Sequence, residues 1–142
     1  MSYLVAFDGT DLSSTALRRA ASFAETNGER LVVVSVLPTD RSLAEQYGLV
    51  EGDEYDPEAA ADRLRETALD IAPDAEFRAE HIDRYAGKGQ IATKIRRAAR
   101  QEGADVVFVG SNNAGRIVKP IASVGDSVAG GLEYDVFIVR SA

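Results

Sequence analysis

The stretch of sequence best suited to chemistry is the turn Gly110-Ser111-Asn112-Asn113-Ala114-Gly115, which directly follows the apolar run Val106 to Val109. Small residues after a parallel strand let backbone N–H groups approach an anion, and a helix starting nearby adds the positive end of its dipole. Ser123 lies where such a helix would begin. Asparagine enters the left-handed region more readily than most residues, so Asn112 and Asn113 can bend the chain as glycine does. The pattern predicts an anion-binding turn.

The charges around this turn favour the same chemistry. Residues 110 to 124 contain Arg116 and Lys119 and no acidic residue, in a chain of net charge -7. A local positive charge beside a helix start attracts anions. An equally open alternative is that both side chains belong to an ordinary solvated loop.

The elements that position this turn follow from hydrophobic patterning. Short unbroken apolar runs indicate strands buried on both faces, and they occur at 3–7, 31–37, 106–109 and 136–139. Residues 76–82 alternate imperfectly and carry charges, which is typical of an edge strand. Two helical patterns begin after the cap candidates Ser13 and Asp56-Pro57, and a third runs from Ile91 to near Gly103. A fourth helix is expected between the last two strands, and one short turn of helix near 43–47.

Strands alternating with helices predict one domain over residues 1–142, an α/β fold with a five-stranded, doubly wound parallel sheet, helices on both faces and Rossmann-like winding. The last strand is hydrophobic, and the three residues Arg140, Ser141 and Ala142 follow it. An unprotected edge of this kind is normally paired. We therefore expect a homodimer through this strand, with Tyr134 and Phe137 as contact candidates or, alternatively, as core residues.

Composition excludes several classes of function. The chain has no Cys and one His, His81, which leaves no thiolate site and no cluster of histidines for a metal. The acidic surface argues against nucleic acid or anionic lipid as a partner. No apolar run reaches membrane-spanning length, and the first strand starts at Tyr3, so we expect a cytoplasmic protein without a signal peptide.

The ratio of thirteen Arg to three Lys, together with the acidic excess, suggests adaptation to high salt. An ordinary acidic protein is the alternative. A melting temperature that does not rise from low to multimolar salt would exclude the adaptation.

Four segments in order, VAFDGTDLSSTALRRA, LVVVSVLP, GQIATKIRRAARQEGADVVFVGS and SVGDSVAGGLEYDVFIVR, make the chain similar to the universal stress protein family over nearly its whole length. The resemblance implies a strand order of 3-2-1-4-5, a homodimer commonly paired through the last strand, an unknown protein partner and, in one branch, an ATP site. It does not imply catalysis as the principal activity. In the ATP-binding branch the loop after the fourth strand carries three glycines, the third followed by Ser or Thr. Gly110 matches the first, whereas Asn113 and Ala122 replace the others and the loop is one residue shorter.

The resemblance also implies which residues would contact a nucleotide. Asp8 matches the acidic residue that meets the nucleoside, although an Asp in a turn can instead bond its own backbone. The adenine pocket would be lined by Ala6, Phe7 and Val36, and the ribose and phosphates would lie near Val109, Gly110, Asn112, Asn113, Ser123 and Val124.

Other classes remain as alternatives. A family branch without nucleotide would act by dimerisation and a protein partner. A phosphoacceptor receiver domain has similar winding, but the last strand ends in Arg140-Ser141-Ala142 without the required Lys, and an ATP pyrophosphatase relative would need a Ser-Gly-Gly loop where Asp8-Gly9-Thr10 stands. Because no nucleophile has an adjacent base, we expect no enzymatic activity.

Overall fold

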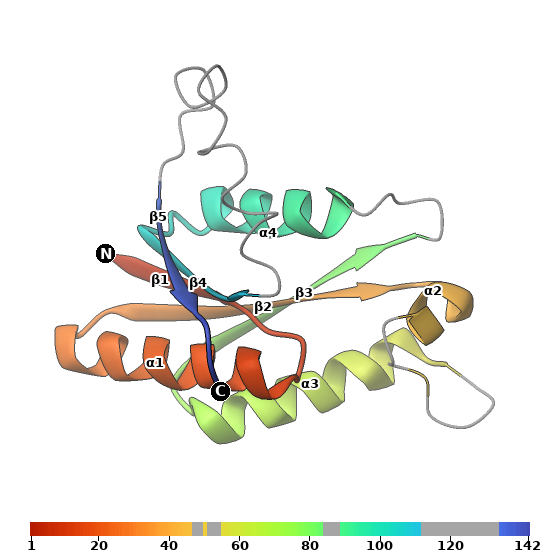
Figure 1. Cartoon of the computed structure of the whole chain (residues 1–142), viewed down its shortest axis with the longest axis horizontal. Helices are drawn as coiled ribbons and strands as arrows, with labels where there is room; N and C mark the ends of the chain where they lie inside the picture. The colour runs from red at the N-terminus through yellow and green to blue at the C-terminus, as the bar shows by residue number, and fades with distance from the viewer. Residues whose placement is uncertain (47–49, 51–54, 84–88, 112–133) are drawn as a thin grey trace, which may run out of the picture.

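Five strands pair side by side, all parallel, in the order β3-β2-β1-β4-β5 (Figure 1). The computed structural model describes residues 1–46, 50, 55–83, 89–111 and 134–142. The strands are β1 (Ser2–Ala6), β2 (Arg30–Pro38), β3 (Glu76–Ile82), β4 (Val106–Gly110) and β5 (Asp135–Val139), and the helices are α1 (Asp11–Asn27), α2 (Arg41–Gln46), α3 (Pro57–Ile71) and α4 (Gly89–Gln101). The expected fold class and strand order are confirmed. The helix expected between the last two strands lies outside the described residues.

Each face of the sheet has its own hydrophobic cluster. Because side chains alternate along a strand, β1 sends Tyr3 and Val5 to one face and Leu4 and Ala6 to the other. The first cluster packs against α1 and α3, and the second packs against α4; these helices lie on opposite sides of the sheet (Figure 1). Both clusters contain fully buried valines from the central strands, which explains why those strands read as unbroken apolar runs.

The end of α1 and the start of α3 agree with the sequence prediction, whereas the start of α1 does not. Gly28 takes a left-handed conformation (φ 66°) after α1, and the side chain of Asp56 accepts a hydrogen bond from the backbone N–H of Glu58 ahead of Pro57. The cap of α1 is Thr10, so the assignment to Ser13 was wrong. Thr10 Oγ1 accepts from the backbone N–H of Ser13 at 3.2 Å, while Ser13 is buried inside the first turn and donates its hydroxyl to the Thr10 carbonyl.

The two edges of the sheet differ in chemistry. The edge strand β3 carries Arg78, which pairs with Glu80 on the same strand and with Glu102 just after α4. Glu102 also pairs with Arg30 of β2, which in turn pairs with Glu76 of β3. His81 is exposed on this strand, as expected. This charged network ties β2, β3 and the end of α4 together.

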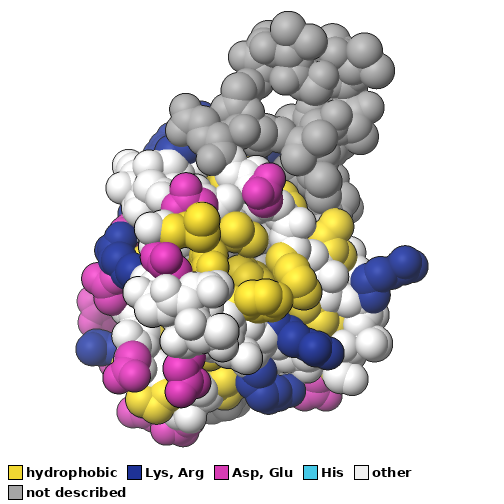
Figure 2. Space-filling model, turned by 90° about the vertical axis from the view of Figure 1, so that its left-hand side faces the viewer, with side chains coloured by type: hydrophobic (Ala, Val, Ile, Leu, Met, Phe, Trp, Pro, Cys, Tyr) yellow, Lys and Arg dark blue, Asp and Glu magenta, His cyan; other side chains and the backbone are white. Residues whose placement is uncertain are grey.

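The opposite edge, β5, is hydrophobic. Phe137 packs inward, with its ring centroid 5.0 Å from Phe108 and 5.6 Å from Phe23 of α1, and Tyr134 is buried in the cluster beneath α4. Ile138 stays 39% exposed and Phe23 43% exposed. Figure 2 shows hydrophobic side chains gathered on one face of the molecule, with acidic and basic groups around them. No helix within the described ranges is long and apolar enough to cross a membrane.

Candidate functional site

The carboxyl ends of β1, β2 and β4 bring three of the expected lining residues onto one face of the sheet. Ala6 pairs with Val34 of β2, so Val36 lies two residues beyond it on the same face, and the β1–β4 register places Val109 beside Ala6. All three belong to, or pack against, the cluster on the α4 side. Ala6 is 9% exposed, Val36 is half-buried and Val109 is fully buried. These side chains form an apolar layer at the strand ends, of which Val36 is the most exposed member.

Phe7 is placed differently from its neighbours. Its side chain is 2% exposed and packs in the cluster on the α1 and α3 side, away from Ala6, Val36 and Val109. Its backbone is held firmly: the N–H donates to the Val34 carbonyl at 2.9 Å, and the carbonyl accepts from the buried hydroxyl of Ser35 at 2.6 Å. Phe7 therefore fixes the backbone at the end of β1, and Asp8 follows from a rigid position.

Asp8 begins the turn between β1 and α1 and is exposed. Its Oδ1 accepts from the backbone N–H of Thr10 at 3.0 Å and from the Thr10 hydroxyl at 2.6 Å, while its own N–H donates to Ser13 Oγ at 3.3 Å. Gly9 has φ 81°, a conformation that favours glycine. Asp8 therefore bonds to its own turn, which was the alternative to a ligand role in the sequence analysis. A carboxylate has about four lone-pair sites, so this turn leaves acceptor capacity for a hydroxyl group of a ligand.

The start of the anion-binding turn adjoins these residues. Gly110 ends β4, is buried, and pairs with Val139 of β5, and Ser111 follows it and is exposed. Asn112, Asn113, Ser123 and Val124 lie outside the described residues. The described part of the site therefore combines an apolar layer, an exposed carboxylate and the end of a buried strand, which suits a flat heterocycle that carries hydroxyl groups.

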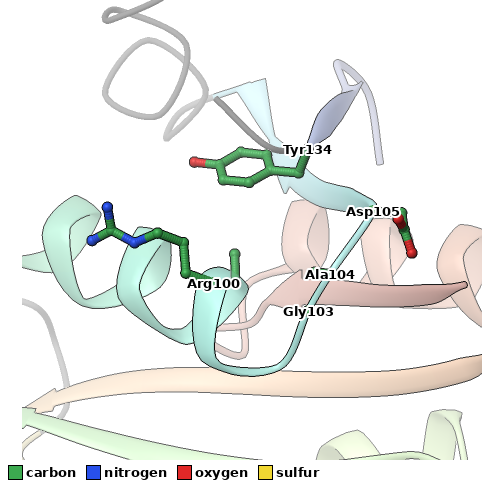
Figure 3. Close-up of a pocket in the computed structure, with 6 residues that line it drawn as sticks. Arg100, Gly103, Ala104, Asp105 and Tyr134 are labelled. Carbon is green, nitrogen blue, oxygen red and sulfur yellow. The ribbon is translucent and has the colours of Figure 1, made fainter. Parts of the chain in front are cut away.

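A cavity of about 230 Å³ lies at the end of the sheet where β4 and β5 begin, lined by Ala99, Arg100, Gly103, Ala104, Asp105 and Tyr134 (Figure 3). Sequence reasoning missed it, because the end of α4 and the start of β5 come together only through the pairing of β4 with β5. Tyr134, two residues before the apolar run 136–139, was the one available signal. Within the described ranges, no group of His, Cys, Asp and Glu side chains is arranged to hold a metal ion.

A family model and several solved structures match this chain. The family model described as the universal stress protein family matches residues 2–140. A universal stress protein family structure from Burkholderia pseudomallei is 23% identical, with 99% of this chain and 96% of that chain covered and a TM-score of 0.57. One from Archaeoglobus fulgidus in complex with dAMP is 20% identical, with 99% and 98% covered and a TM-score of 0.61.

A third structure, of a universal stress protein in complex with cAMP, is 20% identical, with 100% of this chain and 98% of that chain covered and a TM-score of 0.56. At these identities the structural likeness establishes the fold alone. No curated protein matches the chain.

Proposed function

This chain belongs to the universal stress protein family, and on that premise we propose that it is a stress-response module that binds an adenine nucleotide, such as ATP, at the carboxyl ends of β1 and β4. The observation that carries the proposal is the placement of Ala6, Val36 and Val109 on one face at the strand ends, with Asp8 exposed directly beyond β1. In open α/β sheets, ligands bind outside the carboxyl ends of the strands, where the strand order reverses. In this sheet β1 and β4 are the neighbours at that reversal.

Each part of a nucleotide has a counterpart in this arrangement. A purine is flat and largely apolar, so it suits the apolar layer of Ala6, Val36 and Val109, which it would meet chiefly through Val36. Ribose hydroxyls are donors that the Asp8 carboxylate can accept. Related structures in complex with dAMP and cAMP support the ligand class. The fixed backbone of Phe7 and Ser35 holds Asp8 in place before a ligand arrives, which lowers the entropy cost of binding.

We further propose that the ligand is held and not turned over. The hydroxyls of Ser13 and Ser35 donate to backbone carbonyls, and His81 is exposed on the far edge strand β3. Neither arrangement activates a nucleophile.

Calorimetric titration of the full chain with ATP, AMP and cAMP tests the proposal, with Asp8→Asn as the probing variant. The amide oxygen can still accept from Thr10, so the turn is kept while the charge is removed. We expect saturable binding that Asp8→Asn weakens by about tenfold, the loss of one charge-assisted hydrogen bond. Asp56→Asn is the matched control, since Asp56 makes a similar bond to the backbone two residues on but caps α3. Heat traces that stay flat at millimolar concentrations of all three nucleotides would overturn the proposal.

The second candidate is a module without nucleotide that acts by pairing with a second copy. The exposure of Phe23 and Ile138 on either side of β5 favours it. The two candidate functions are compatible. A nucleotide titration without heat, together with a solution mass of two chains, would support the second and exclude the first.

A further inference from the structure

The cavity at the amino edge of the sheet is bounded by two separate parts of the chain. The last turn of α4 and the turn into β4 lie on one side, and the ring of Tyr134 lies on the other (Figure 3). Its volume of about 230 Å³ is below the roughly 300 to 1,000 Å³ typical of sites for drug-sized ligands. A ligand of a few heavy atoms would fit it.

Tyr134, which lines this cavity, carries a buried hydroxyl. Tyr134 is 8% exposed, and its hydroxyl oxygen is buried without a hydrogen-bond partner among the residues that the structure describes. A buried hydroxyl without a partner costs free energy, because its bond to water is lost on folding. Tyr3, the other buried tyrosine at this end of β1, bonds to the side chain of Asn27 at 2.9 Å. The unpartnered oxygen of Tyr134 thus stands out among buried hydroxyls.

Basic side chains of α4 lie near this hydroxyl. The tyrosine hydroxyl and the guanidinium of Arg100 extend in the same direction over α4 (Figure 3). Burial raises the pKa of Tyr134, and the charges of Arg96 and Arg100 oppose that rise, so both arginines are close enough to act on it. The four charged side chains of α4 are all basic: Lys94, Arg96, Arg97 and Arg100. Arg96 and Arg100 therefore place positive charge near the Tyr134 hydroxyl.

The remaining polar groups of the cavity do not oppose an anion strongly. The carboxylate of Asp105 points away from Tyr134 in Figure 3 and accepts from the backbone N–H of Ser2 at 2.9 Å. The end of a helix normally repels anions through its free carbonyls. Here the carbonyls of Ala99 and Arg100 already accept from the N–H groups of Ala104 and Gly103 in the turn that closes α4.

We propose that this cavity binds a small oxyanion, a carboxylate or a phosphate group, which accepts hydrogen bonds from the Tyr134 hydroxyl and the Arg100 guanidinium. Arginine has donors and no acceptor, so the ligand must supply acceptor oxygens. Such charge-assisted bonds are the stronger kind, and the ligand would give the buried hydroxyl its missing partner. The site is separate from the proposed nucleotide site, since it lies where β4 and β5 begin, and the nucleotide would lie where β1 and β4 end.

Nuclear magnetic resonance of the full chain tests this site, with inorganic phosphate and succinate as the probes at constant ionic strength. We expect saturable shifts of the backbone amides of Gly103, Ala104 and Asp105 with at least one probe. The preferred probe separates phosphate from carboxylate as the recognised group. Tyr134→Phe and Arg100→Gln should each weaken that binding by about tenfold, as loss of a hydrogen bond to a charged group predicts.

Two matched controls accompany these variants. Arg97→Gln removes the same charge from the same helix at a residue that does not line the cavity, and Tyr3→Phe removes a buried hydroxyl elsewhere. Both should bind like the unchanged protein. The proposal is overturned if neither probe saturates, if Tyr134→Phe binds as tightly as the unchanged protein, or if Arg97→Gln weakens binding as much as Arg100→Gln. ATP added to the same samples should shift the amides of Gly110 and Ser111 at the carboxyl end of β4. Binding at the two sites is therefore measured separately, and either proposal can fail without the other.

Discussion

Gly9, in the turn after β1, lies directly against Leu64 of α3: a β-carbon built at Gly9 would stand 3.1 Å from Leu64 Cδ2. The contact joins the turn that holds Asp8 to a helix that packs under the sheet. Gly9 has a positive φ of 81°, so an added side chain would strain the backbone as well as crowd the leucine.

We predict that Gly9→Ala lowers the free energy of unfolding by about 1 to 2 kcal/mol through backbone strain, with a further loss from the contact with Leu64. Gly28→Ala is the matched control, because Gly28 has φ 66° and an added β-carbon would meet no atom within 4 Å. Denaturant unfolding of both variants separates strain from crowding. A loss in Gly9→Ala no larger than that in Gly28→Ala would show that Leu64 moves aside freely.

Ser35→Ala is expected to destabilise the end of β1. The hydroxyl is buried and donates to the Phe7 carbonyl at 2.6 Å, so its removal takes a partner from a buried acceptor. The expected cost is about 1 to 3 kcal/mol in urea unfolding. Thr67→Ala serves as the control, since its hydroxyl also donates to a backbone carbonyl, that of Arg63, but on an exposed helix face. Equal losses in the two variants would contradict the account.

Glu102 should make stability depend on pH in the acid range. Hydrogen bonding from Arg30, with a further bond from Arg78, holds its pKa below the usual value of 4.5, against the effect of burial. A carboxyl group whose pKa is lowered by folding stabilises the native state above its unfolded pKa and loses that effect as the pH falls through the folded value.

The melting temperature of the unchanged protein should therefore exceed that of Glu102→Gln at neutral pH, and the difference should shrink below about pH 4.5. Glu66→Gln, at an exposed position on α3, controls for the general loss of one negative charge. A difference that stays constant down to pH 3 would exclude the ion pairs as its source.

The two tyrosines that are buried among the described residues should respond differently to loss of the hydroxyl in the absence of ligand. Tyr3→Phe removes the partner of Asn27 and should cost about 1 kcal/mol. Tyr134→Phe removes an oxygen without a partner among the described residues and should leave stability within about 0.5 kcal/mol or raise it. Thermal unfolding of the two variants in the same buffer makes the comparison, and a large loss in Tyr134→Phe would indicate a bond to that oxygen.

On the proposed pairing through β5, Ile138→Lys should reduce the solution mass from that of two chains to that of one. Ile138 is 39% exposed on the edge strand β5, and a charge there would be buried without a partner in a paired edge. Sedimentation equilibrium measures the mass. His81→Lys adds a similar charge to the opposite edge strand and should leave the mass unchanged. A mass of two chains in Ile138→Lys would place the contact elsewhere.

The sequence predicted the strands and most helix ends, because those depend on local patterns. Gly28 and Asp56-Pro57 have one physical role each, and the structure confirms both. Thr10 and Ser13 are both good caps, and the choice between them depends on Asp8, which binds the Thr10 hydroxyl and so fixes the start of α1. The resemblance placed Phe7 and Ala6 together in one pocket. Neighbouring residues on a strand face opposite sides, so alternation along the strand would have predicted that their side chains lie on different faces of the sheet.

The cavity where β4 and β5 begin could not be predicted from local sequence patterns, for a different reason. Arg100 and Tyr134 are distant in sequence, and only the register of β4 against β5, with Val106 beside Asp135, brings their segments together. The missing hydrogen bond of Tyr134 is likewise a property of the packed chain.

The unlike edges of the sheet would limit how large the proposed assembly through β5 can grow. On β3, Glu76, Arg78 and Glu80 present alternating charges that would be stripped of water by an incoming strand, whereas β5 presents Val136 and Ile138. An association through β5 uses the same edge in both copies, so it closes on itself by twofold symmetry. Head-to-tail growth into a filament would require β3 to accept β5, and the charges on β3 oppose that.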